Sequence, residues 1–249
     1  MFSFRPFALA LAVVLPAGTA VFAQAPSTSS QPSDSSSAPT AQEPAQPAQS
    51  SGEATVQARV RARRAQRRAQ AIKDTYGNLY EVYAGGGYLR FQPGPALQRV
   101  TFYSWDAGLT RYFSDQLGVT LEGRGYYGTP FVGVNSTGIT RPAVSNHDVL
   151  IGPTYRFILH PKYSIAGRVM GGMALGNFSG DTNGFGTQIL GLWPDGTTYA
   201  VNGSIIGEAN ITPNLSLRLA GDYLGTGFGS TMQNSLGFNY GFVVRFGKR

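Results

Sequence analysis

The sequence predicts an all-β fold, an eight-stranded antiparallel up-and-down β-barrel, within residues 76–249. Three observations predict it. Apolar and polar residues alternate with period two in eight successive segments. These segments predict strands of about 10–14 residues, whereas an average strand has about five or six. The connections alternate between short turns at 114–116, 159–162 and 212–214 and longer loops. Of these loops, 129–144 and 177–198 are long and rich in Gly, Asn, Thr and Pro, and 92–98 and 227–234 are of middle length. The alternating segments are 80–91, 101–113, 117–124, 148–156, 164–175, 201–211, 215–223 and 236–246.

Three segments of different character precede the barrel. Residues 1–23 have the pattern of a signal peptide, because Arg5 is followed by an apolar run that ends in small residues at Ala23. A membrane anchor is the alternative interpretation of this segment. Residues 24–51 are mostly Ser, Pro, Gln, Ala and Thr, which predicts a disordered linker. Residues 52–75 are rich in Ala, Arg and Gln, which favours a short basic helix.

The composition excludes several kinds of site. The chain has no Cys and only two His, so disulfides and Cys-type zinc sites are excluded, and we expect no metal and no cofactor. The net charge of +7 is unevenly placed, because residues 53–75 hold seven basic and two acidic residues (7 − 2 = +5). The positive charge is therefore local, and with an export signal in front of it we expect no nucleic-acid partner.

The strands indicate a transmembrane barrel. A tilted membrane-spanning strand needs about 9–11 residues. Aromatic residues gather near strand ends, as they do at the two interfaces of a membrane. A soluble ligand-binding barrel is the alternative, but it would leave too much apolar surface outside a narrow lumen. The aromatic residues expected in these girdles are Tyr103, Trp105, Tyr112, Phe113, Tyr126, Tyr127, Phe131, Tyr155, Phe157 and Tyr163.

The other face of the strands carries charges of both signs and is expected to line the lumen. Side chains fill the interior of an eight-stranded barrel, and an unpaired charge there is costly. We therefore predict that the charges pair and that the lumen is plugged, with at most a narrow water path. The predicted lumen network consists of Glu81, Asp106, Glu122, Arg124, Asp148, Arg156, Arg168, Glu208, Arg218, Asp222 and Arg245.

The last strand resembles the C-terminal assembly signal of outer-membrane barrels. It has Gly241 two residues after a polar Asn239, and the signal is completed by Phe242, Val244 and Phe246, although three residues follow Phe246. The stretch Val82–Tyr88 is similar to the first strand of the OmpA/OmpX-type, porin-like barrel families.

This resemblance covers roughly residues 80–246 and implies a location in the bacterial outer membrane. It also implies contact with outer-membrane lipid and lipopolysaccharide, and with the barrel-assembly machinery and periplasmic chaperones during biogenesis. Because the strand number is even, both termini are expected in the periplasm. We expect a monomer.

The basic segment 52–75 is expected either to contact an anionic partner, a cell-wall polymer or anionic lipid, or to serve as a solvated spacer. The two interpretations are equally compatible with the sequence. The residues of the predicted anionic-partner contact are Arg59, Arg61, Arg63, Arg64, Arg67 and Arg68.

The resulting hypothesis is a structural or porin-like outer-membrane barrel that is not an enzyme. Two alternatives stay open: a narrow passive pore for small solutes, and a lipid-modifying enzyme of the lipid A deacylase type. The enzyme would use Ser145 and His147, which are two residues apart and so share a face of one strand. Their order is the reverse of the one that this family's motif leads us to expect, and no acid lies at an obvious position to orient the imidazole.

Overall fold

The computed structural model describes residues 50–229 and 231–248. The predicted signal peptide, residues 1–23, and almost all of the predicted linker lie outside the described residues. The first described element is helix α1 (Ser50–Tyr76), which is slightly longer than the predicted basic segment. It ends at Tyr76, and the N–H of the next residue, Gly77, donates to the carbonyl of Lys73 at 2.8 Å. Within the described part of the chain, no helix is long and apolar enough to cross a membrane.

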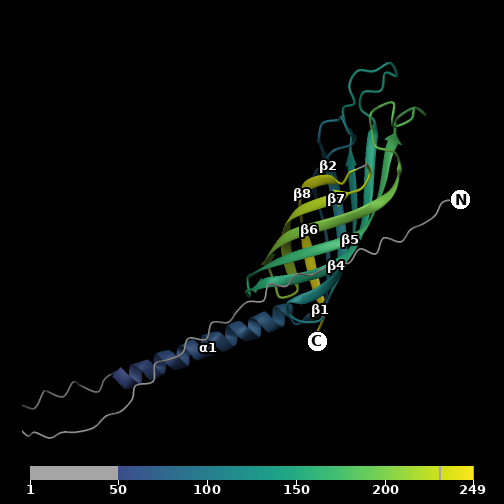
Figure 1. Ribbon diagram of the computed structural model, residues 1–249. Helices are drawn as coiled ribbons and strands as arrows, with labels where there is room; N and C mark the ends of the chain where they lie inside the picture. The colour runs from purple at the N-terminus through teal and green to yellow at the C-terminus, as the bar shows by residue number, and fades with distance from the viewer. Residues whose placement is uncertain (1–49, 230, 249) are drawn as a thin grey trace, which may run out of the picture. The chain divides into compact units, whose positions relative to one another are not determined.

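Eight antiparallel strands follow the helix and close into a barrel, with each strand paired to its neighbours in sequence and the last paired to the first (Figure 1). The predicted fold class is therefore confirmed. The strands are β1 (Asn78–Phe91), β2 (Val100–Tyr112), β3 (Leu117–Gly128), β4 (Ala143–Leu159), β5 (Tyr163–Gly180), β6 (Gly196–Asn210), β7 (Leu215–Thr226) and β8 (Gln233–Lys248).

The barrel has two different ends. At one end, which we call the turn end, lie the three short connections, the start of β1 and the end of β8 (Figure 1). The four longer connections, residues 92–99, 129–142, 181–195 and 227–232, lie at the other end, the loop end. Two predicted loops, 129–144 and 177–198, are too long, because strands β4, β5 and β6 run into them. Gly and Asn near Gly180 suggest a loop, but pairing with β4 holds them in the sheet.

Side chains alternate between the interior and the outer wall along every strand, as period two requires. The barrel closes where β1 meets β8, and Gly85 and Gly241 lie opposite each other there. A Cβ on Gly85 would lie only 2.2 Å from the carbonyl oxygen of Tyr240. Glycine is therefore required for the close approach of the closing strands.

Candidate functional site: the lumen and the outer wall

All eleven charged residues of the predicted lumen network are buried inside the barrel. Nine of them form ion pairs, and these divide into two groups. The group nearer the turns, the turn-end cluster, contains Glu81, Arg156, Glu208, Arg218 and Arg245. The second group, the central cluster, contains Glu122, Arg124, Arg168 and Asp222.

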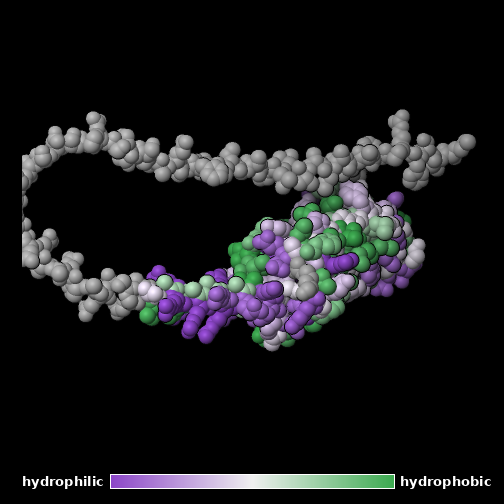
Figure 2. All heavy atoms as spheres, turned by 90° about the horizontal axis from the view of Figure 1, so that it is seen from below, coloured by the Kyte–Doolittle hydropathy of each residue, from purple (hydrophilic) through white to green (hydrophobic). Residues whose placement is uncertain are grey.

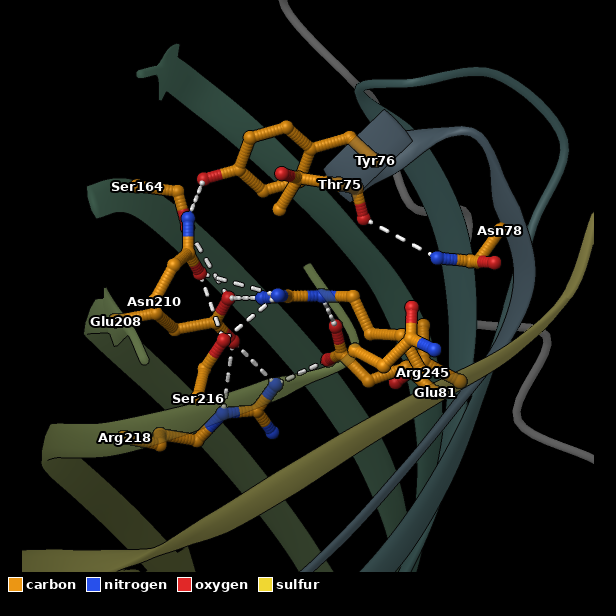
Figure 3. A network of polar contacts seen from close by, with 12 residues as sticks. Thr75, Tyr76, Asn78, Glu81, Ser164, Glu208, Asn210, Ser216, Arg218 and Arg245 are labelled. Atoms are coloured by element: carbon orange, nitrogen blue, oxygen red, sulfur yellow. Dashed lines mark hydrogen bonds and ion pairs between the residues drawn. The ribbon is translucent and has the colours of Figure 1, made fainter. Parts of the chain in front are cut away.

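The turn-end cluster joins three guanidinium groups to two carboxylates. Figure 3 shows four of its members, Glu81, Glu208, Arg218 and Arg245. Glu81 accepts from Arg156 at 2.5 Å, from Arg245 at 3.1 Å and from Arg218. Glu208 accepts from Arg218 at 2.6 Å and from Arg245 at 2.5 Å. These residues come from β1, β4, β6, β7 and β8, so the cluster spans the interior of the barrel and ties opposite walls together.

Tyr76, the last residue of α1, closes the turn end of the lumen. Its side chain is 0% exposed. Its hydroxyl donates to the carbonyl of His160 at 2.9 Å and accepts from the Asn210 amide at 2.7 Å. Its ring lies 4.9 Å from the guanidinium carbon of Arg156 and 5.2 Å from that of Arg245, within the range of cation–π contacts. The period-two pattern of the strands does not identify this residue, because it belongs to the helix.

The central cluster is built around Glu122 and Arg124. Glu122 pairs with Arg124 on its own strand and with Arg168 at 2.6 Å. Arg124 also reaches Asp222 at 3.0 Å, on the β7 wall. Two arginines and two carboxylates therefore balance in this group. The Asp222 carboxylate accepts from three further side chains, Ser204, Asn202 and Asn239.

Tyr83 connects the two clusters. Its hydroxyl donates to Glu122 and accepts from Arg168 at 2.6 Å, so it belongs to the central cluster. The face of its ring lies 4.2 Å from the guanidinium carbon of Arg218, in the turn-end cluster. The two groups of charges are therefore packed against one another through a single buried ring.

Two carboxyl groups of the predicted network form no ion pair within the described residues. Asp106 and Asp148 both lie opposite Arg124 in the strand register, yet Arg124 bonds elsewhere. Asp148 accepts from Asn146 at 2.8 Å. Asp106 borders a cavity of about 10 Å³ that Tyr83 also lines. A space of this size holds about one water molecule, so it is no path for solutes.

Toward the loops the lumen is filled by apolar side chains, which the sequence analysis did not predict. Four phenylalanine rings, Phe91, Phe102, Phe178 and Phe228, pack with centroid separations of 5.1–6.3 Å. Connections 129–142 and 181–195 fold over them and contribute further buried side chains. The buried members of this apolar plug are Leu89, Phe91, Phe102, Tyr126, Ile139, Val144, Leu150, Met170, Ala174, Phe178, Leu190, Leu192, Ala200, Leu224 and Phe228.

The outer wall is apolar around the barrel. Figure 2 shows hydrophobic side chains on the barrel surface and mainly hydrophilic ones on α1. Two residues of the expected aromatic girdles were wrongly assigned, because Tyr112 and Tyr126 face the lumen and are 2% and 1% exposed. In each case the next residue, Phe113 or Tyr127, occupies the outer wall. The other expected girdle residues are exposed, namely Tyr103, Trp105, Phe131, Tyr155, Phe157 and Tyr163.

Ser145 and His147 lie on the outer wall of β4, near the loop end. The Nε2 atom of His147 is 2.8 Å from the Tyr127 hydroxyl on β3, and the two rings meet edge to face. The imidazole is thus engaged with a tyrosine. Within the described residues, His147 makes no hydrogen bond to Ser145, so the structure does not assemble the nucleophile–base pair that the enzyme hypothesis needs. No group of three or more potential metal ligands is present there either.

Except for Gly241, the residues of the other two predicted sites are exposed. Phe242, Val244 and Phe246 lie on the outer wall of β8, and Phe246 stacks on Tyr80 of β1 with ring centroids 5.7 Å apart. Gly241 faces inward, against the backbone of β1. All six arginines between Arg59 and Arg68 are exposed on α1.

Comparison with solved structures finds small outer-membrane barrels. Neisserial surface protein A has a TM-score of 0.47 and 14% identity over 67% of this chain and 97% of that chain. Ail of Yersinia pestis, in complex with the heparin analogue sucrose octasulfate, has a TM-score of 0.45 and 14% identity over the same shares. OprG of Pseudomonas aeruginosa has a TM-score of 0.46 and 10% identity over 68% and 97%. At these identities the likeness concerns the fold alone. No protein-family model and no curated protein sequence matches the chain.

Proposed function

We propose that the chain is an outer-membrane β-barrel with a closed lumen, a structural component of that membrane and not an open channel. The observation that carries the proposal is the double filling of the lumen, by ionic clusters toward the turns and by the apolar plug toward the loops. "Porin-like" then describes the fold and not a transport mechanism.

The outer wall supports the membrane location. Large apolar side chains are exposed on all eight strands, whereas soluble proteins rarely expose extended apolar patches. In water this surface would cause aggregation, whereas in a bilayer it contacts the lipid acyl chains. Closure leaves no unpaired strand edge, which a membrane requires of β-structure. By the pattern of bacterial barrels, the turn end faces the periplasm and the loop end faces outward.

The closed lumen supports a structural role. An ion that crosses the barrel must displace paired guanidinium and carboxylate groups from one another and then pass the ring cluster around Phe91. Removing a partner from buried ion pairs costs several kcal/mol. A narrow passive pore would open only if both the ionic clusters and the apolar plug moved out of the lumen.

The first prediction tests this role directly. The protein reconstituted into planar bilayers is expected to show no large, stable current steps, and the same preparation is expected to show heat-modifiable mobility on gels. Outer-membrane fractionation checks the location. Recovery of the protein in the soluble periplasm would overturn the membrane assignment, whereas a stable open channel would overturn only the closed lumen.

Helix α1 adds a second, anionic-partner function at the turn end. Its arginines are exposed and spread along more than two turns, and no acidic side chain stands between Arg59 and Lys73. Such a surface attracts phosphate or carboxylate groups of lipid or cell-wall polymer. The solvated-spacer interpretation predicts no such binding.

The second prediction concerns these arginines. A full-length variant with the six arginines replaced by Gln is expected to lose at least about tenfold in co-sedimentation with anionic vesicles or isolated cell wall, since each basic group near an anionic surface contributes about 1 kcal/mol and about 1.4 kcal/mol corresponds to tenfold. The six Lys replacements, which keep the charge, are the matched control. The native binding should also weaken at high salt. Equal sedimentation of the Gln and Lys variants would leave α1 as a spacer.

A further inference from the structure

A groove of about 570 Å³ lies on the outer wall at the loop end, outside the lumen described above. Its volume falls within the range of small-molecule sites, about 300–1,000 Å³. Its lining mixes aromatic and polar side chains. Its lining residues include Thr101, Tyr103, Tyr127, Ala143, Ser145 and Asn177.

The groove exists because large and small side chains follow one another across the strands. The register places Tyr103 of β2 beside Tyr127 of β3, then Ser145 of β4 and Asn177 of β5. Two rings thus form one wall, and the two smaller residues leave a hollow beside them. An irregularity in the β4–β5 register falls between Ala143 and Ser145, at the floor of the hollow. Bulges of this kind are common at barrel rims and beside functional sites.

Hydrogen bonds fix the aromatic wall. The Tyr127 hydroxyl lies 2.8 Å from His147 Nε2, and the indole N–H of Trp105 donates to the same hydroxyl at 3.4 Å. Gly125 lies between Trp105 and His147 in the register and leaves room for the indole. A Cβ at Gly125 would come within 2.3 Å of the indole nitrogen. The groove is thus bordered by polar groups that already have partners.

The charged side chain of Arg90 lies beside the groove, in contact with the lining residue Thr101. Arg90 is exposed on the outer wall of β1, opposite Thr101, and its Nη1 atom donates to the Thr101 hydroxyl at 3.3 Å. Within the described residues Arg90 forms no ion pair. An arginine on the lipid-facing wall is costly at the midplane of a bilayer and is tolerated near the head groups. The groove therefore lies at the depth where lipid phosphates meet acyl chains.

We propose that this groove binds one lipid of the surrounding leaflet whose phosphate head group carries a net negative charge, in preference to a zwitterionic phospholipid. The phosphate pairs with Arg90, and an acyl chain lies in the hollow between Tyr127 and Asn177. Arginine suits this task because its planar group donates two parallel hydrogen bonds to phosphate oxygens. The inference rests on the proposed membrane location. It gives the Tyr127–His147 pair a positioning role in place of a catalytic one.

Brominated lipids test the site, because the chain has only two tryptophans and one of them, Trp105, contacts Tyr127 in the lining of the groove. In the variant Trp193→Phe, Trp105 is the only tryptophan, so the tryptophan fluorescence reports on its surroundings alone. The protein is placed in phosphatidylcholine nanodiscs that contain a minor, equal fraction of chain-brominated phosphatidylglycerol or chain-brominated phosphatidylcholine. Quenching by the anionic lipid is expected to exceed that by the zwitterionic lipid by about threefold, in keeping with one charge-assisted contact.

Two substitutions and two controls complete the test. Arg90→Gln should make the two lipids quench equally, and Ser145→Leu, which fills the hollow, should lower quenching by both. Arg111→Gln removes an outward arginine from the other end of β2, and Ala209→Leu enlarges an outward residue at the turn end, so both should leave the ratio unchanged. Equal quenching by the two lipids in the parent protein, or an unchanged quenching ratio in Arg90→Gln, overturns the proposed lipid site. Failure to insert into nanodiscs overturns instead the proposed membrane location.

Discussion

Replacing Glu81 with Ala is expected to lower the free energy of unfolding by about 3–5 kcal/mol, the cost of leaving a buried charge without its partner. Glu81 is the carboxylate on which Arg156, Arg218 and Arg245 converge. Its loss leaves three buried guanidinium groups to share Glu208. Urea titration of the protein in lipid vesicles, followed by tryptophan fluorescence, measures the change.

The matched control is Asp106→Ala, which removes a buried lumen carboxyl that forms no ion pair within the described residues. We expect a change of less than about 1 kcal/mol, because no guanidinium group loses its partner. A double variant, Glu81→Gln with Arg156→Gln, removes one charge of each sign and should recover part of the lost stability. Equal effects of Glu81→Ala and Asp106→Ala on the free energy of unfolding would show that the ion pairs of the turn-end cluster add no stability beyond that of an unpaired buried carboxyl.

The strand faces were predictable from the sequence because period two is a local property. Alternation between Thr101 and Phe113 assigns each side chain of β2 to a face without any knowledge of its neighbours. The errors arose where two aromatic residues are adjacent, as at Tyr112–Phe113 and Tyr126–Tyr127. Alternation sends one ring of each pair inward, but both had been assigned to the girdles by their position at strand ends.

The partners inside the lumen could not be predicted in the same way. Local register suggests that Arg124 pairs with Asp106 or Asp148, which lie directly opposite it on β2 and β4. In the structure Arg124 bonds instead to Glu122, two residues away on its own strand, and to Asp222 on β7. Contacts across a lumen depend on barrel diameter, strand tilt and side-chain length, and none of these is a local property of the sequence.

The apolar plug was missed for a different reason. Its strand residues have the same alternation phase as the charged residues; Leu89 and Phe91, for example, share a face with Glu81. What distinguishes them is position along the strand, since the charges occupy the turn end and the centre of the lumen, whereas the apolar residues extend from the centre to the loop end. Reading each inward face from one end to the other would have found this gradient. The contributions of Ile139 and Leu190 from the loops have no periodic signal at all.

Two fillings in series lead to a prediction about conductance that neither would give alone. The ionic clusters and the apolar plug are two consecutive barriers, and we expect each of them to be high enough to stop the current by itself. Lowering only one of them therefore leaves the current near its baseline. We expect no current steps when Phe91, Phe178 and Phe228 are replaced by Ala, because the ionic clusters still close the lumen. We also expect none when Glu208 and Arg218 are both replaced by Ser, because the apolar plug remains.

The combined variant is expected to conduct, with planar-bilayer currents at least about tenfold above either set alone, which corresponds to a barrier lowered by about 1.4 kcal/mol. The control replaces three outward phenylalanines, Phe113, Phe157 and Phe242, with Ala, so that the same mass of aromatic side chain is lost from the wall and not from the lumen. Heat-modifiable mobility must show that each variant is folded. If the plug variant alone conducts as well as the combined variant, the ionic clusters are no barrier, and their role in this barrel is stability and not closure.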